Sequence, residues 1–238
     1  MSRHGASILL TALVAACSAP GRAPAADGQQ LSPNTLTAEE QGEGFKLLFD
    51  GATLNGWRGF KRADAAGWDV VEGTIHHATG EVDLLTVEEF QDFELRLDWR
   101  ISPGGNSGIF YRGTEEYDEI YWSAPEMQVL DDSAHADALN RLTAAGSDYA
   151  LYPAPAGVVH RAGEWNSVRI IARGHHVEHW MNGVKVVEYE LDSPDWRARV
   201  AASKFHAWPN YGKASKGHIA VQVHGGDIRY RNVRIRVF

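Results

Sequence analysis

The chain has 238 residues, 44% hydrophobic and 23% charged, which is typical of a globular protein and excludes a disordered one. Lys and Arg number 23 against 31 Asp and Glu, a formal net charge of −8. That sign disfavours a protein that binds nucleic acid by neutralising phosphates. The single cysteine excludes an intrachain disulfide framework and any cysteine-rich metal site. The 24 glycines and the many aromatic residues favour a β-protein with surfaces suited to flat rings.

The first segment has the features of a secretion signal. Arg3 and His4 precede an apolar run over residues 7–16, too short to span a bilayer but long enough for a signal-peptide core. The sequence LVAAC at residues 13–17 resembles a bacterial lipoprotein box, in which cleavage leaves Cys17 as the lipidated N-terminus. A plain signal peptide with an incidental cysteine is the alternative.

The following segment, to about residue 44, is rich in Ala, Pro, Gly, Gln and Ser and predicts a flexible tether. We therefore expect a signal peptide at 1–16, a lipidated N-terminus and tether at 17–44, and a folded domain at 45–238. The protein would then be exported and face the periplasm or cell exterior, with the lipid as its only membrane contact.

From Phe45 onward, short strands alternate with turns. The segment 93–101 is the clearest, with apolar residues at every second position, and Asn182-Gly183 predicts a type I′ hairpin. No long amphipathic helix interrupts the pattern, so we expect an all-β, antiparallel two-sheet sandwich. The expected strands are 46–50, 68–71, 93–101, 107–112, 126–130, 166–173, 177–181, 184–189, 219–224 and 228–237.

The stretch 131–163 breaks this pattern. It is long for a loop in a compact domain, and such loops are usually functional. We expect it to carry a short helix near 136–142 and to fold over one face, with Asp131 in the wall of the site.

Alternation along the strands assigns side chains to faces. In the strands at 107–112, 126–130 and 219–224 the apolar positions belong in the core, which places the polar ones on an outer face. Such residues are either solvated or gathered in a site, and the long loop nearby favours the site. The polar positions are Asn106, Arg112, Glu126, Gln128, Gln222 and His224.

Two other signals are weaker. His175 and His179 would meet as metal ligands only on a helix, and the hairpin that follows predicts a strand instead, which separates them by roughly 13 Å. Ser107 lies in Gly-Asn-Ser-Gly, which is not the elbow of a serine hydrolase.

Several motifs in one order resemble the 3-keto-disaccharide hydrolase family, long catalogued as a bacterial domain of unknown function. The resemblance covers residues 45–238 and implies a concanavalin-A-like jelly roll that acts on sugars oxidised to a ketone at C3. One departure is Val221-Gln-Val-His-Gly225, where the family tends to have Leu-Gln-Asp-His-Gly. The motifs are LFDGATLNGW at 48–57, FELRLDWRIS at 93–102, GGNSGIFYR at 104–112, PEMQVLD at 125–131, GEWN at 163–166, HVEHWMNGVKVVEY at 176–189 and GHI at 217–219.

A 3-keto glycoside explains why these residue types are needed. The ketone acidifies the proton at C2, so His224 or Glu126 could act as the base. Arg112 or Lys204 could stabilise the enolate oxygen. A divalent cation such as Ca²⁺, held by Asp131, Glu126 and carbonyl oxygens, could replace them. The expected substrate-binding residues are Asn106, Gln128, Asp131, Tyr149, Tyr152, Lys204, Trp208 and Gln222.

Two other functions stay open. A carbohydrate-binding module on the same fold would need aromatic and amide side chains but no base. A β-glucanase would carry a Glu-x-Asp-x-x-Glu strand, which this chain lacks. We expect a carbohydrate substrate and no nucleic-acid partner, and the oligomeric state is left open.

Overall fold

The computed structural model describes residue 1 and residues 32–238. The predicted signal peptide, Cys17 and the tether up to residue 31 lie outside the described residues. The strands are β1 (Lys46–Leu47), β2 (Trp57–Gly59), β3 (Trp68–Val71), β4 (Thr74–His77), β5 (Leu84–Phe90), β6 (Phe93–Ile101), β7 (Asn106–Gly113), β8 (Glu126–Leu130), β9 (Asn166–Arg173), β10 (His176–Met181), β11 (Val184–Glu190), β12 (Gly217–Val221) and β13 (Ile228–Val237). The helices are α1 (Ala38–Gly42) and α2 (Pro194–Ala202), with 3₁₀ turns η1 (Ile120–Trp122), η2 (Ala136–Leu139) and η3 (Lys204–Ala207).

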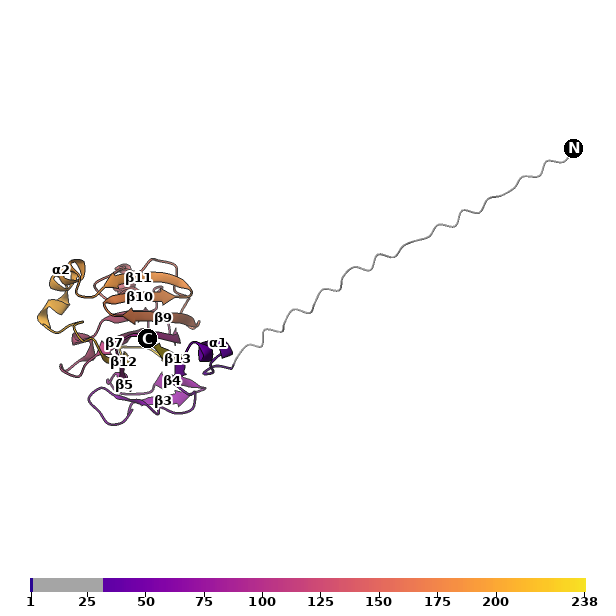
Figure 1. Ribbon diagram of the computed structural model, residues 1–238, viewed down its shortest axis with the longest axis horizontal. Coiled ribbons are helices and arrows are strands. Elements are labelled where there is room, and N and C mark those ends of the chain that lie inside the picture. Colours follow the sequence, from indigo (N-terminus) through magenta and orange to yellow (C-terminus); the bar gives the residue numbers. More distant parts are fainter. Residues whose placement is uncertain (2–31) are drawn as a thin grey trace. The chain divides into compact units, whose positions relative to one another are not determined.

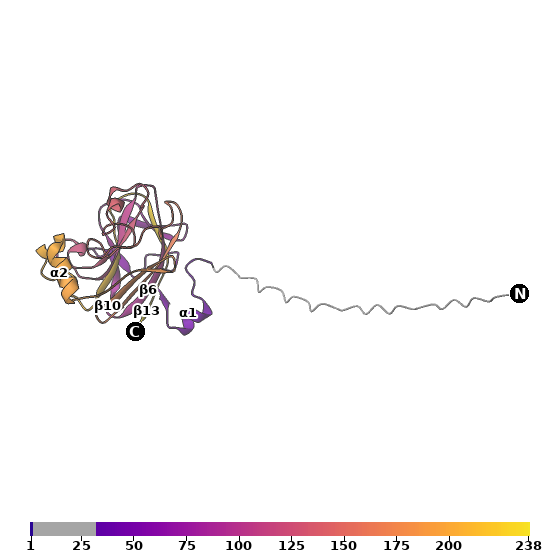
Figure 2. The same cartoon turned by 90° about the horizontal axis from the view of Figure 1, so that it is seen from above.

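These strands form two antiparallel sheets (Figure 1). The large sheet has the order β11-β10-β9-β6-β13-β4-β3, with β1 paired to β13, and the small sheet has the order β2-β5-β12-β7-β8. Seen from above, α1 and α2 lie on opposite sides of the sandwich (Figure 2). The predicted all-β, two-sheet jelly roll is confirmed.

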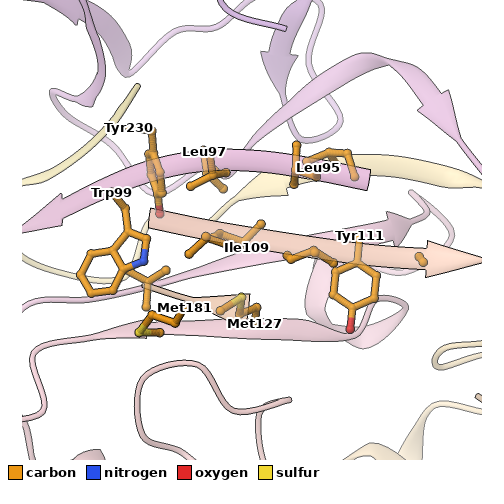
Figure 3. Close-up of a cluster of buried hydrophobic side chains, with 14 of the residues drawn as sticks. Leu95, Leu97, Trp99, Ile109, Tyr111, Met127, Met181 and Tyr230 are labelled. Carbon is orange, nitrogen blue, oxygen red and sulfur yellow. The ribbon is translucent and has the colours of Figure 1, made fainter. Parts of the chain in front are cut away.

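The core lies between the sheets and follows the predicted alternation. Leu95, Leu97 and Trp99 of β6 meet Ile109 and Tyr111 of β7 there, all nearly inaccessible to solvent (Figure 3). Because successive strand residues point to opposite faces, the intervening residues of β7 and β8 face outward from the small sheet. That outer face carries the site described below.

The strands that the sequence failed to predict are β2, β4 and β5. β5 lies between β2 and β12 in the small sheet, but it begins with three consecutive buried residues and continues with three exposed ones. The register of its neighbour β12 shifts between His218 and Ala220, which indicates a bulge. A bulge breaks the alternation on which strand prediction depends.

The folded body begins before residue 45, where the sequence placed its boundary. Thr37 and Glu40 cap α1 reciprocally, the side chain of each accepting from the other's backbone N–H. The buried Glu40 carboxylate also accepts a hydrogen bond from Arg234 of β13 at 2.6 Å. Residues 37–44 therefore belong to the sandwich, not to a tether.

Two helical segments shape the small-sheet side. The N-cap Ser193 accepts from the N–H of Trp196, and Pro194 starts α2, which leads directly into η3. The helix expected near 136–142 is the shorter turn η2. In the described part of the chain, no helix has the length and hydropathy required to cross a membrane.

Candidate active site

A cavity of about 140 Å³ opens on the outer face of the small sheet. Its floor comes from β7, β8 and the residues after β12, and its walls come from η1, η3 and the 131–163 loop. The sequence predicted every lining residue except Tyr121. The lining residues are Asn106, Tyr121, Glu126, Gln128, Tyr149, Lys204, Gln222 and His224.

Glu126 is the buried carboxyl group of this cavity. It is 5% exposed, and burial raises its pKa to about 8, with Asp83, Asp148 and Asp137 adding to the rise and Lys204 opposing it. No hydrogen bond from another described residue reaches its carboxylate. A carboxyl group with a pKa near neutrality can both release and accept a proton at physiological pH.

Gly108 makes room for this carboxyl group. Phe110 of β7 pairs with Glu126 of β8, and Gly108 lies two residues away on the same outer face. A Cβ atom at Gly108 would come within 2.1 Å of the Glu126 Oε1. The glycine in the GGNSG motif therefore allows the Glu126 side chain to lie flat over the neighbouring strand.

Three amide side chains surround Glu126. Asn106, Gln128 and Gln222 are each more than nine-tenths buried, and each has an amide oxygen without a hydrogen-bond partner among the described residues. The Gln128 amide is oriented by its Nε2, which donates to the carbonyl of Thr143 at 3.2 Å. Unpaired buried oxygens are costly, and sugar hydroxyl groups are the donors that would satisfy them.

Lys204 brings a positive charge to the opposite wall. Its ammonium lies 4.5 Å from the ring centroid of Tyr149 and 5.3 Å from that of Tyr121. Burial lowers the pKa of Lys204, whereas Glu126 and Asp137 act to raise it. Burial also raises the pKa of Tyr149 to about 12, so its hydroxyl stays protonated and can donate a hydrogen bond.

Arg112 lies outside this group, which corrects the expectation that it shares a face with Glu126 and His224. Its backbone adopts a left-handed conformation, with φ at 53°, so alternation along β7 ends there. The buried guanidinium donates to the carbonyls of Gln91 and Gly174, both at 2.8 Å, and to Asp92 at 3.1 Å. Arg112 therefore connects the turn at Gln91 and Asp92 to the turn at Gly174. Among the described residues, Lys204 is the one lysine or arginine side chain that lines the pocket.

Asp131 does not line the pocket, contrary to prediction. Its carboxylate accepts from the N–H of Gly104 at 2.8 Å and from the Ser133 hydroxyl at 2.6 Å. Despite the opposing effect of partial burial, these hydrogen bonds leave its pKa below the ordinary value. The Ca²⁺ site expected from Asp131 and Glu126 together is therefore not formed.

Two aromatic residues also lie outside the lining. Tyr152 stacks on Tyr189 with ring centroids 4.8 Å apart, and its hydroxyl donates to Asp195 at 2.8 Å. Trp208 lies behind Tyr121, with ring centroids 6.4 Å apart, and stacks on Trp122 at 5.0 Å. From the 131–163 loop, Tyr149 is the residue that reaches the pocket.

His224 lies at the exposed rim of the pocket, beyond the end of β12 at Val221. Tyr121, the residue that the sequence failed to predict, comes from η1. A single 3₁₀ turn between two strands leaves no periodic signal in a sequence.

One His/Glu cluster elsewhere has the composition of a metal site. His176, Glu178 and Glu188 place ligand atoms within 4.8 Å of one another on β10 and β11. Lys185 donates to both glutamates, at 3.3 Å to Glu178 and 2.5 Å to Glu188. The predicted strand geometry holds here, because His179 is buried in the core side of β10 and does not join the cluster.

Comparison with known proteins agrees with this fold. Residues 44–236 match the model of the 3-keto-alpha-glucoside-1,2-lyase-like domain. The 3-keto-disaccharide hydrolase of Bacteroides thetaiotaomicron is 35% identical, over 86% of this chain and 82% of its own length.

Two solved structures from Parabacteroides distasonis, both of proteins assigned to the glycosyl hydrolases, share the fold. The first has a TM-score of 0.83 at 34% identity, covering 87% of this chain and 100% of its own. The second has a TM-score of 0.63 at 26% identity, covering 82% and 99%. The chain therefore belongs to the 3-keto-alpha-glucoside-1,2-lyase-like family and is an enzyme that cleaves glycosides.

Proposed function

We propose that this protein is an exported enzyme that cleaves 3-keto-glycosides, including 3-keto-disaccharides, by removing the proton at C2. The observation that carries the proposal is Glu126, a buried carboxyl group with a pKa of about 8 in a pocket with Lys204. Comparing the cleavage of a 3-keto glucoside with that of its parent glucoside tests the proposal.

In the first step, Glu126 takes the C2 proton and the electron pair of that C–H bond forms an enolate. The negative charge develops on the C3 oxygen, where the Lys204 ammonium and the Tyr149 hydroxyl are suited to stabilise it. The buried amides of Asn106, Gln128 and Gln222 orient the sugar hydroxyls.

In the second step, the enolate expels the oxygen at C1, which takes a proton from His224 at the rim. The product is an enone with a double bond between C1 and C2. Water then adds its oxygen to C1 and gives one of its protons back to His224, and Glu126 returns a proton to C2. One water molecule is consumed for each glycosidic bond broken, so the net reaction is hydrolysis.

Glu126 is the better choice of base than His224, although the sequence allowed either. The carboxyl group is buried in the floor of the pocket, whereas His224 is exposed at its edge. A base must reach a carbon acid inside the pocket and be shielded from water.

The second candidate function is a carbohydrate-binding module that does no chemistry. The amides and aromatic residues of the pocket would serve a module equally well. A buried, unpaired carboxyl group would not, because its burial carries a cost that binding alone does not require. The absence of any cleavage of 3-keto glycosides by the folded protein would favour the module.

Replacing Lys204 with Met is expected to lower kcat/KM for a 3-keto glucoside by roughly 10²–10³-fold, the range found when one oxyanion-stabilising group is removed. Because Lys204 opposes the rise in the pKa of Glu126, the acidic limb of the pH profile should also move to higher pH. Lys216→Met, at an exposed lysine, is the control. A variant with normal activity and an unmoved profile would exclude Lys204 from the mechanism.

Export and lipidation at Cys17 are also part of the proposal, supported by the lipoprotein-like sequence around that residue. Replacing Cys17 with Ser should move the protein from the membrane fraction to the soluble fraction of cells. Immunoblotting of the two fractions measures the change. Membrane association that persists in the serine variant would contradict lipidation.

A further inference from the structure

A second groove, of about 330 Å³, lies on the outer face of the large sheet. The catalytic pocket lies on the outer face of the small sheet, so the two sites are on opposite faces of the sandwich. The groove is lined by Arg96, Leu97, Asp98, Ser167, Val168, Arg169, Trp180, Gly183 and Arg234.

A row of three arginines crosses this groove. Arg96 of β6 pairs directly with Arg234 of β13 on one side and with Arg169 of β9 on the other. Arg169 in turn pairs with Trp180 of β10. Like charges placed directly opposite each other destabilise a sheet, so such a row needs counter-charges or a function.

Acidic residues neutralise two of the three arginines. Buried Glu94 accepts from Arg96 at 2.7 Å, and Glu40 of α1 accepts from Arg234 at 2.6 Å. Asp98, also in the groove, is held by Asn232 at 2.6 Å and by Arg231 at 3.3 Å. Glu94, Glu40 and Asp98 are thus each hydrogen-bonded to a particular partner.

Arg169 is the arginine that these acids hold most weakly. Its nearest carboxylate oxygen, on Glu94, is 4.0 Å away, and no hydrogen bond joins its guanidinium to another described residue. The guanidinium lies 4.1 Å from the ring centroid of Trp180, whose Nε1 donates to Glu178 at 2.6 Å. The indole, fixed by Glu178, therefore holds the Arg169 guanidinium in place, and the N–H groups of the guanidinium stay available for an anion.

Two other arginines on the same face have no acidic partner at all among the described residues. Arg100 lies over the ring of Trp165, and Arg173 over that of Phe238. Arg173 is four residues beyond Arg169 on β9, a separation of roughly 13 Å along a strand. The free charges are therefore spread along the sheet and suit an extended ligand rather than a single small anion.

We propose that this groove binds an anionic polysaccharide, with Arg169 as its principal contact and Arg173 and Arg100 as flanking contacts. The carboxylate or sulfate groups of such a polymer can each meet one guanidinium. A flat anionic membrane would also meet the carboxylates of Asp98 and of Glu43, an exposed residue at the end of α1. The half-buried, hydrogen-bonded Trp180 is also poorly placed to insert into lipid.

The test is binding of the purified domain to immobilised polygalacturonate, which supplies carboxylates, and to dextran sulfate, which supplies sulfates. Neutral dextran and vesicles containing phosphatidylglycerol are measured in parallel. We expect binding to at least one anionic polymer, weakened by added salt, and no binding to dextran. Arg169→Ala should weaken it about tenfold or more, as expected for loss of a hydrogen-bonded charge.

Arg197→Ala is the matched control, because Arg197 is an exposed arginine on α2, paired with Asp192. Arg169→Lys keeps the charge but loses the planar fork, and should bind with intermediate affinity. Circular dichroism and thermal melting establish that each variant is folded. Binding to vesicles alone, no binding to either anionic polymer, or equal weakening by Arg169→Ala and Arg197→Ala would each overturn the proposal.

Discussion

Replacing Glu126 with Gln should lower kcat/KM for a 3-keto glycoside by roughly 10²–10⁴-fold, the usual contribution of a general base. Gln keeps the size of the side chain over Gly108 but cannot accept the C2 proton. Because the base acts when deprotonated and its pKa is about 8, wild-type kcat/KM should rise with pH up to about that value. The rising limb should be lost in the variant.

Glu164→Gln provides the control, because Glu164 is an exposed glutamate that does not line the pocket. His224→Ala should cost less than Glu126→Gln if His224 only assists the leaving group. Near-normal activity of Glu126→Gln, together with loss of activity in His224→Ala, would assign the base to His224 instead.

The same Glu126→Gln variant should gain stability at alkaline pH. Burial raises the pKa of Glu126 above its ordinary value of 4.5, so the folded chain binds this proton more tightly than the unfolded chain. Stability is therefore lost as pH rises from about 4.5 to about 8, by about 1 kcal/mol for each pKa unit of the difference. A glutamine side chain cannot ionise, so the variant should melt at a higher temperature than wild type at about pH 9, above the pKa of the folded state.

The second large effect concerns the substrate. A glucoside that keeps its C3 hydroxyl has no acidified proton at C2. Glu126 then has no acidic proton to remove, and no enolate forms for Lys204 to stabilise. We expect its cleavage to be slower than that of the 3-keto glucoside by at least the roughly 10²–10⁴-fold that a general base contributes. The rates of product formation from the two sugars, measured under identical conditions, give the ratio of their cleavage rates.

Binding and chemistry must be separated in this comparison. A competition measurement shows whether the parent glucoside enters the pocket, and single-turnover rates then compare the two sugars when both are bound. Equal rates for the bound sugars would exclude an enolate, because the ketone would then play no part in the reaction.

Part of the candidate site could be predicted from the sequence, because Asn106, Glu126 and Gln128 lie on regular strands. Alternation in β8 placed Glu126 and Gln128 together on the outer face, and alternation after Ile219 did the same for Gln222 and His224. Period-2 patterning needs only an extended chain, which β8 supplies.

Predictions failed where the backbone departs from that regular pattern. Arg112 follows the alternation of β7 in sequence, but its positive φ turns the side chain toward the carbonyls of Gln91 and Gly174. Asp131 follows β8 directly, and its carboxylate is used to close the turn at Ser133. The contacts that capture these side chains come from distant turns and local hydrogen bonds, which a strand pattern does not record.

Cleavage of a 3-keto glucoside in D₂O tests the central claim, deprotonation at C2, most directly. The product is analysed by mass spectrometry and NMR at early times, with 3-keto glucose alone in D₂O as the control for exchange after cleavage. If C2 is deprotonated and later reprotonated, the product should carry deuterium at C2 from the first turnover. A product that retains its original hydrogen at C2, together with a cleavage rate that is unchanged when the substrate carries deuterium at C2, would contradict the mechanism.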